Sequence, residues 1–360
     1  PSCSGYEGAM DRTELTEAAA DHLAEAAACK RAGDGPACIA ALEQAVHLAE
    51  RADNPLVLHT ARFRLAQAHH DVGDPHAMLA AITPLLDRGN PFATHPAALG
   101  AMEPIARRYH DTLGYGEPAL TALWQQWSAA QAERGDPFLA AMGHVHMAWQ
   151  LACVGALDAL HGLLGRYLAL TPKAFGTGPH RHPLAPSTPE SLPFVQADLA
   201  RTALRAATWV GDDAFAWSAA EALEDAMEDA DRAREADFWF LEPMVHAAGR
   251  FGWADVLERY RTPYRMALSG LEHPRAPFHE PLGAGWLAAR ADQPERAIPH
   301  LLAAADIARD QRWGPEWEAY ALALALPAQL QAGDEQLPGT ERRLAAVVKR
   351  FGVRALEPRQ

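Results

Sequence analysis

The sequence predicts an all-α protein, a right-handed α-solenoid of about eight helix-turn-helix repeats. A small-residue turn, usually Gly followed closely by an acid, recurs about every 40 residues, with one longer interval between Gly155 and Gly211. Between the turns, apolar residues recur at helical spacing, as in Leu42, Val46 and Ala49. Such a period is typical of a solenoid, in which each unit buries its apolar face against its neighbours. The turns lie at Gly33-Asp34, Gly73-Asp74, Gly116-Glu117, Gly155 with Asp158, Gly211-Asp212, Gly252 with Asp255, Ala291-Asp292 and Gly333-Asp334.

The starts of many helices are marked by a capping residue followed by Pro. An Asp or Asn side chain accepts a hydrogen bond from a first-turn N–H, and Pro at the first helical position loses no hydrogen bond. A Gly near a helix end supplies the left-handed backbone that a helix exit prefers. The capping pairs are Asn54-Pro55, Asp74-Pro75, Asn90-Pro91, Asp136-Pro137, Gln293-Pro294 and Gly314-Pro315.

These signals predict two helices in each unit. The first helices are expected at 13–32, 55–72, 96–113, 137–154, 193–210, 235–251, 276–290 and 315–332. The second helices are expected at 36–52, 75–88, 117–134, 156–170, 212–232, 253–270, 294–311 and 339–351.

The repeat predicts one elongated domain over 11–351, in spite of a length that would otherwise suggest two or three domains. Residues 1–10 differ in composition and are expected to be an added remnant before a native start at Met10, or disordered. A Pro- and Gly-rich loop insertion is expected at 171–193, as a surface excursion, a lid or a partner contact. Residues 352–360 are expected to form a C-terminal tail.

Charge and composition narrow the function classes. A formal net charge of −14 argues against direct nucleic-acid binding as the main activity. No run of residues approaches the length needed to span a membrane, and four cysteines are too few for a disulfide framework, so we expect a cytoplasmic protein. A disulfide between Cys29 and Cys38 remains a lesser alternative to two small buried side chains.

No catalytic motif and no cofactor or metal site is predicted. His144 and His146 point to different sides of a helix and cannot readily share an ion. His180 and His182, in the expected loop, could share one, but no third ligand lies nearby in the sequence.

The helix pairs resemble tetratricopeptide repeats. The residues that carry the resemblance are Leu65-Ala66, the turn Gly73-Asp74, and then Ala77, Ala80-Ala81 and Leu85. The chain is similar to the longer, roughly 40-residue version of these repeats in the sensor regions of bacterial maltose-regulator-like signal-transduction proteins, over residues 13–351. The resemblance implies binding of a protein, a peptide or a small effector on a concave face lined by the first helices, and no catalysis.

Counting back about 13, 10, 6 and 3 residues from each turn Gly selects the side chains expected to face this groove. Arg201 and Arg205 lie one helical turn apart, and Arg64 or Arg108 from earlier repeats could extend the positive surface. A planar guanidinium suits a carboxylate or phosphate, so we expect these arginines to hold an anionic group; salt bridges within the protein are the alternative. The candidate ligand-binding residues are Phe63, Arg64, Gln67, Arg108, Trp149, Arg201, Arg205, Trp239, Glu242 and His246.

The leading hypothesis is therefore a non-enzymatic adaptor or sensor that holds a peptide, a protein segment or a small anionic effector. One alternative is an enzyme that uses His70 and His246 with Glu242 as acid–base groups. Another is a structural subunit of a larger assembly. A homodimer through an apolar strip near the end of the last helix is a further expectation; the strip comprises Leu344, Val347, Val348 and Phe351.

Overall fold

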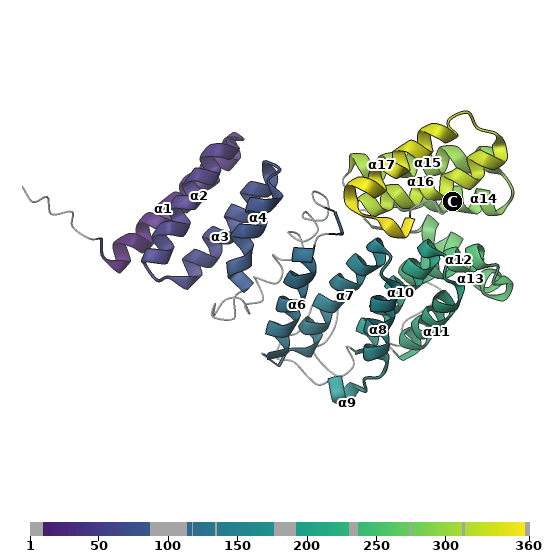
Figure 1. Ribbon diagram of the computed structural model, residues 1–360, viewed down its shortest axis with the longest axis horizontal. Coiled ribbons are helices and arrows are strands. Elements are labelled where there is room, and N and C mark those ends of the chain that lie inside the picture. The colour runs from purple at the N-terminus through teal and green to yellow at the C-terminus, as the bar shows by residue number, and fades with distance from the viewer. Residues whose placement is uncertain are drawn as a thin grey trace, which may run out of the picture. The chain divides into compact units, whose positions relative to one another are not determined.

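The computed structural model describes residues 10–86, 114–116, 118–133, 135–175, 192–229, 237–273, 276–311 and 314–356. These residues form helices that pack in adjacent pairs, and they contain no strand (Figure 1). The predicted all-α repeat class is thereby confirmed at the level of paired helices. The chain divides into two compact units, Pro1–Thr112 and Leu113–Gln360, which are described one at a time.

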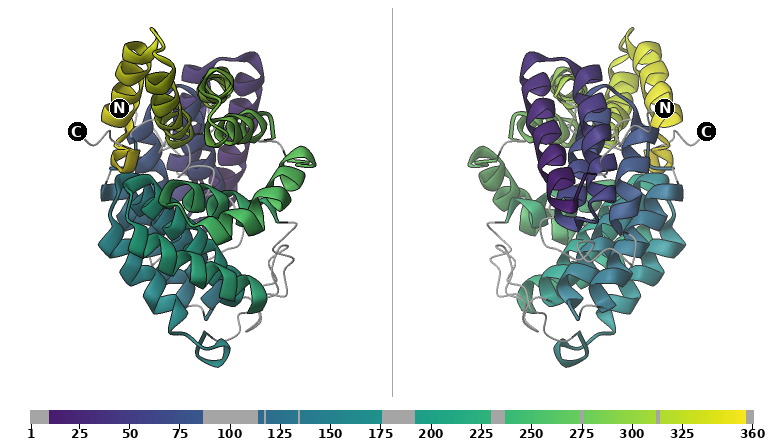
Figure 2. Two further views of the ribbon diagram at one scale, coloured as in Figure 1. Left: turned by 90° about the vertical axis from the view of Figure 1, so that its right-hand side faces the viewer. Right: turned by 90° about the vertical axis from the view of Figure 1, so that its left-hand side faces the viewer.

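The first unit contains α1 (Arg12–Ala32), α2 (Gly35–Arg51), α3 (Pro55–Asp71), α4 (Pro75–Ile82) and the 3₁₀ turn η1 (Thr83–Leu86). Each helix packs on the next, and the right-hand view of Figure 2 shows α1 to α3 side by side in purple and blue. The Asp11 side chain accepts from the N–H groups of Thr13 and Glu14, and the Glu14 carboxylate accepts from Asp11 N, so α1 begins with a complete capping box.

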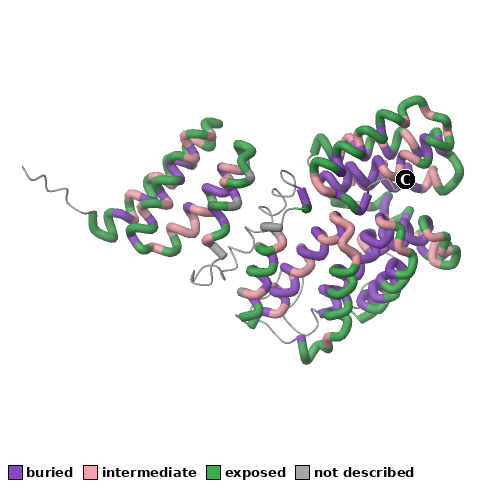
Figure 3. Tube along the Cα trace, viewed as in Figure 1, coloured by how far each residue is buried: buried purple, intermediate pink, exposed green. Residues whose placement is uncertain are grey.

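The second unit begins with α6 (Pro118–Glu133), α7 (Pro137–Val154), α8 (Leu157–Leu168), the short α9 (Pro172–Phe175), α10 (Leu192–Val210) and α11 (Asp213–Asp229). It continues with α12 (Phe238–Phe251), α13 (Ala254–Ser269), α14 (Ala276–Arg290), α15 (Pro294–Asp310), α16 (Pro315–Ala332), α17 (Leu337–Phe351) and the 3₁₀ turn η3 (Arg354–Leu356). Besides its partner α11, α10 contacts α7, α8 and α12, so that first helices of successive pairs are neighbours. Figure 3 shows α10 and α12 buried along most of their length.

The turn chemistry explains why the bounds of the described helices agree with the expected ones to within a few residues. The helix expected at 96–113, and residues 1–9 of the expected N-terminal remnant, lie outside the described residues. Gly33 ends α1 in the left-handed region at φ 76°, and its N–H bonds to the carbonyls of the last turn. In two turns without Gly, Asp53 and Asp292 take the left-handed conformation at φ 46° and 56°, which Asp tolerates better than most residues.

The structure differs from the expectation at the start of the loop insertion and in the C-terminal tail. Residues 172–175, expected in the loop insertion, form the helical turn α9, and the rest of that insertion up to residue 191 lies outside the described residues. The expected C-terminal tail is folded as far as Leu356, because Gly352 turns the chain at φ 67° and Val353, Ala355 and Leu356 are buried. The turn η3 contacts α7, α10, α16 and α17.

The second unit joins its first described residues to its last helix. Tyr115 N donates to Phe351 O at 2.8 Å, and the Tyr115 hydroxyl donates to the Glu316 carboxylate at 2.5 Å. A Cβ on Gly114 would meet the Phe351 carbonyl, so only Gly fits there. Contacts between residues this far apart in the sequence hold the end of the unit against its beginning.

The apolar strip near the end of α17 is not a free surface. Leu344, Val347 and Val348 are buried in the core of the second unit, and Phe351 is half-buried against it. A homodimer would therefore need another surface, because these side chains already pack against their own chain. Over the part of the chain described, we find no helix with the length and apolar character needed to cross a membrane.

Close packing between α12 and α14 gives a test of the fold. A Cβ on Gly249 would lie 2.5 Å from the Trp286 ring, whereas a Cβ on Gly162 of α8 would meet nothing within 4 Å. We expect Gly249→Ala to destabilise the protein by about 1–3 kcal/mol through overpacking. Gly162→Ala, the matched control, should be neutral or stabilise by up to about 1 kcal/mol through helix propensity. Urea unfolding of both variants measures the difference; equal stabilities would contradict this packing.

Candidate functional site

The candidate residues divide between the two units. Phe63, Arg64 and Gln67 lie on α3 of the first unit, where Phe63 and Gln67 are half-buried and Arg64 is exposed. Arg64 Nη1 lies 3.4 Å from the Leu23 carbonyl, which is a long hydrogen bond. Arg108 lies outside the described residues. The remaining candidates, Trp149, Arg201, Arg205, Trp239, Glu242 and His246, lie on α7, α10 and α12 of the second unit.

Two arginines on α10 each hold a carboxylate of the protein itself. Arg201 pairs with Asp198, three residues earlier on the same helix, and its side chain is 26% exposed. Arg205 directs both Nε and Nη2 to the same oxygen of Glu242 on α12, with the Nε contact at 3.2 Å, and both side chains are buried. The structure thus contains the salt bridges that were the alternative to a free arginine pair, one half-buried and one buried.

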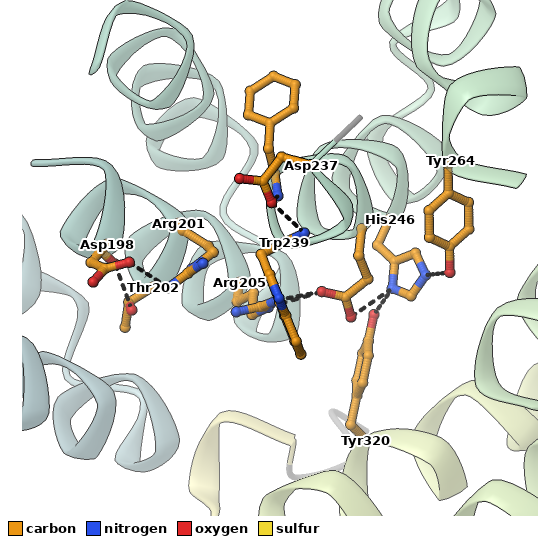
Figure 4. A network of polar contacts seen from close by, with 11 residues as sticks. Asp198, Arg201, Thr202, Arg205, Asp237, Trp239, His246, Tyr264 and Tyr320 are labelled. Atoms are coloured by element: carbon orange, nitrogen blue, oxygen red, sulfur yellow. Dashed lines mark hydrogen bonds and ion pairs between the residues drawn. The ribbon is translucent and has the colours of Figure 1, made fainter. Parts of the chain in front are cut away.

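The buried pair is part of a chain of polar contacts across four helices (Figure 4). His246, one turn after Glu242 on α12, has its Nδ1 4.0 Å from the second Glu242 oxygen. The same Nδ1 is hydrogen-bonded to the Tyr320 hydroxyl of α16 at 2.6 Å. On the other side of the ring, Nε2 lies 3.5 Å from the Tyr264 hydroxyl of α13. This network, Arg205–Glu242–His246 with Tyr320 and Tyr264, connects α10, α12, α13 and α16.

Burial and charge set the protonation states in the network. Burial by itself raises the pKa of Glu242, but the charge of Arg205, then those of His246 and His279, and the Arg205 hydrogen bond lower it to about 2. Burial lowers the pKa of His246 to about 4; the Glu242 charge opposes this shift and the Arg205 charge adds to it. Burial, with the Glu242 charge, raises the pKa of Tyr264 and Tyr320. At neutral pH the network therefore contains one ion pair, a neutral imidazole and two neutral phenols.

Aromatic rings surround this network. Trp149 of α7 contacts Trp209 of α10 and Trp317 of α16, each with ring centroids 5.7 Å apart. The Arg205 guanidinium lies 5.7 Å from the centroid of Trp317, and His246 stacks on Trp286 at 4.9 Å.

Trp239 lies beside the network and remains half-buried. Its ring contacts His273 and His279 at 5.0 and 5.2 Å, and its backbone N–H is capped by Asp237. Trp149 is half-buried as well, so both predicted tryptophans keep part of their surface open.

The enzyme alternative requires Glu242, His246 and an arginine to converge, and the structure brings these three together in a buried position. A general base needs a free ring nitrogen within reach of a substrate. His246 is 3% exposed, and tyrosine hydroxyls lie against both of its nitrogens. Glu242, at 1% exposure, is held by Arg205. The side chain of His70 lies outside the described residues.

The other histidines and cysteines offer no second centre in the described part of the chain. His144 is hydrogen-bonded to Tyr167 at 2.7 Å, while His146 stacks on Trp124, so the two rings have different neighbours. Cys29, Cys38 and Cys153 carry free thiols, and burial raises the pKa of Cys38 and Cys153. Within the described ranges no group of three or more potential metal ligands occurs, and His180 and His182 lie outside those ranges.

Tyr320 and His279 are absent from the candidate residues because the groove spacing was applied only as far as Gly252. Trp317 lies 16 residues before Gly333, so that spacing does not select it. Counting back 13 residues from Gly333 reaches Tyr320, and the same count from Asp292 reaches His279. The spacing applies only to the first helix of each pair, so it cannot select Tyr264, which lies on the second helix α13.

Comparison with known proteins adds no assignment. None of the protein-family models matches the chain, and no curated protein matches it. The fold and the site define the class only as an all-α protein of paired, repeat-like helices with a buried charge network. The functional argument therefore depends on the geometry of that network and its surroundings.

The two arginines should differ sharply in their contribution to stability. Arg205→Met leaves the buried Glu242 carboxylate without its partner, so we expect a loss of about 3–5 kcal/mol. Arg201→Met removes a partly exposed pair and should cost less than about 1 kcal/mol. Urea unfolding measures both, and the double variant Arg205→Met, Glu242→Met should recover most of the loss. Similar losses for the two single variants would contradict the buried pairing.

His246 should make the protein less stable in mild acid. Its folded pKa of about 4 lies below the ordinary value of 6.5, so the unfolded chain binds the proton more tightly. Stability from this group is fully present above pH 6.5 and is lost as the pH falls towards 4. Between pH 7 and 5 the loss is on the order of 2 kcal/mol. We expect His246→Gln to have a flatter dependence of the unfolding midpoint on pH in this window; an unchanged slope would contradict the assignment.

Proposed function

We propose that the chain is a right-handed α-solenoid of about eight tetratricopeptide-like repeats and acts as a non-enzymatic adaptor or sensor. Its inner face, on the first helices of successive pairs, would hold a peptide, a protein segment or a small anionic effector. The observation that carries the proposal is the set of charges on α10 and α12, flanked by the half-buried Trp149 and Trp239. Neighbouring inner helices with apolar contacts alone would be sufficient for folding.

The costs of burial support a role beyond folding. An ion pair taken out of water recovers its desolvation cost only with good geometry, and a well-packed apolar replacement is often equally stable. Stability alone therefore does not require Arg205, Glu242 and His246 at these positions. In our proposal they fix the position of the inner helices and of the partly open tryptophans, whose flat faces provide apolar contact area for a ligand.

Arg201 is the side chain best placed to exchange partners. Its pair with Asp198 is partly exposed, and its Nε is buried without a hydrogen-bond partner. An incoming carboxylate or phosphate would replace Asp198 at Arg201 at little cost, because a partly exposed pair contributes little. Arg205 would remain with Glu242. The sequence predicted that Arg201 and Arg205 together hold an anionic group. In the proposal only Arg201 exchanges its partner, and Arg205 stays paired with Glu242.

The proposal also includes a cellular location and an oligomeric state. A sensor or adaptor of this type would work in the cytoplasm of a bacterium, as part of signal transduction. Homodimerisation stays a prediction, now without the strip on α17. Exposed large apolar side chains on the described helices of the second unit are single residues on different helices, such as Leu168, Met266 and Leu330. This dispersal gives no support to the reading as a structural subunit.

Native mass spectrometry tests the proposal directly. The protein is purified gently from cells in which it is naturally made, together with Arg201→Ala and the matched control Arg296→Ala, an exposed arginine on α15. We expect an anionic peptide or metabolite to be retained by the natural protein and the control, and lost from Arg201→Ala. Bare protein in all three samples, or equal retention in all three, would refute the role of Arg201.

A further inference from the structure

The outer face of the second unit carries an exposed pair of indole rings. Trp217 of α11 is 45% exposed, and its ring meets that of Trp253 edge to face, with centroids 4.9 Å apart and planes at 87°. Trp253, which precedes α13, also stacks on Phe251 at 5.5 Å. We call Trp217, Trp253 and Phe251 the aromatic corner. A large aromatic ring this open to water is typical of a contact surface.

Both indole N–H groups of the corner are already used. Trp217 Nε1 donates to the Glu221 carboxylate at 2.9 Å, and Trp253 Nε1 donates to the Asp213 carboxylate at 2.9 Å. Indole has no other donor, so the corner presents only ring faces, which carry partial negative charge, and carboxylate oxygens. Such a surface repels anions and attracts cations.

The helix around Trp217 strengthens this preference. Between Asp213 and Asp229, α11 contains six carboxylates and neither Lys nor Arg. Asp213, Trp217, Glu221 and Asp225 follow one another at intervals of four residues and are all exposed, so they share one face of the helix. Trp217 therefore lies between two carboxylates on a uniformly acidic face.

Positive side chains do occur at the edges of this surface. Arg250 lies against Gly211, where a Cβ would be 2.9 Å from its Nη2. Arg259 of α13 lies 3.7 Å from Glu224. Among the described residues, no Lys or Arg is placed over the ring of Trp217 or Trp253.

One turn after Glu221 on α11, Glu224 and the ring of Tyr260 already lie near a cation, the Arg259 guanidinium. The Glu224 carboxylate accepts from the Tyr260 hydroxyl at 2.6 Å, and the Arg259 guanidinium lies near Glu224 and 5.7 Å from the centroid of the Tyr260 ring. Trp217 and Glu221 form the same kind of pair, because the indole N–H donates to the carboxylate as the Tyr260 hydroxyl does to Glu224. At Trp217, however, no cation from the described residues lies over the ring.

We propose that the aromatic corner binds an arginine side chain from a basic segment of a partner protein. The guanidinium would lie over the Trp217 face and donate to Glu221 or Asp213. Arginine fits better than lysine, since its planar, weakly hydrated head stacks on a ring while its edge donates to carboxylates. This surface lies on a second helix and is independent of the inner face, so the proposal does not rest on the proposed function.

The test is binding of short peptides to the full chain, measured by calorimetry. The probes are octapeptides that alternate Gly with Arg, Lys or Gln. We expect the Arg peptide to bind more tightly than the Lys peptide, and the Gln peptide not to bind. Trp217→Ala should weaken binding of the Arg peptide about tenfold, the effect of roughly 1.4 kcal/mol of cation–π and contact energy. Trp217→Phe, which keeps a ring face, should lose less.

Controls separate the corner from the general attraction of an acidic protein for any basic peptide. Glu221→Gln should weaken binding more than Glu341→Gln, which removes an exposed charge on α17. Met266→Ala removes an exposed apolar side chain of α13 outside the corner and should leave binding unchanged. Because Trp217 is exposed, its variants should keep the unfolding midpoint of the natural protein, which circular dichroism checks. Absence of binding, or equal binding by the natural protein and Trp217→Ala, would overturn the proposal.

Discussion

The arrangement of the second unit depends on the ion pair between Arg205 and Glu242. It joins α10 to α12 in a region closed to water, where an unpaired charge would be costly. Through Glu242 and His246 the constraint reaches Tyr320 on α16, 74 residues further along the chain. Stacking of His246 on Trp286 adds α14. The ion pair and the contacts of His246 together therefore link the first helices of four successive pairs.

A second set of long-range contacts joins Tyr115 and α7 to the start of α16. The Tyr115 hydroxyl reaches Glu316 at the start of α16, and Gln150 of α7 donates to the Tyr115 carbonyl at 2.9 Å. Trp149 then packs on Trp317, whose ring also contacts the Arg205 guanidinium, Phe278 and His279. The start of α16 is thus held by polar contacts from one direction and by aromatic contacts from the other. A ligand on the inner face would bind to a surface whose shape is already fixed, which lowers the entropic cost of binding.

The sequence could predict the local features of this fold, because each is encoded by neighbouring residues. Asp136-Pro137 marks the start of α7 and Gly155 its end, and both bounds agree with the structure. Spacing along the first helices also selected Arg205, Glu242 and His246, which the structure places close together. It could not show that Arg205 pairs with Glu242, since the choice between a ligand and an internal partner depends on the distance between helices. Tyr264 and the packed turn η3 were beyond its reach for the same reason: their contacts come from elements distant in the sequence.

Charge is distributed differently on the two helix sets of the second unit, although the whole chain is acidic. On α10, Arg201 is paired with Asp198 and Arg205 with Glu242, so each arginine is balanced by one carboxylate. On α11, which packs against α10, carboxylates are in excess and lie on both sides of an exposed indole along the helix. Local balance keeps the buried site stable, because an uncompensated charge there would destabilise the fold. At the surface no such requirement applies, so an excess of one sign can persist and select partners of the opposite sign. The same helix pair therefore carries a partly exposed arginine on α10 and an acidic face with an exposed indole on α11.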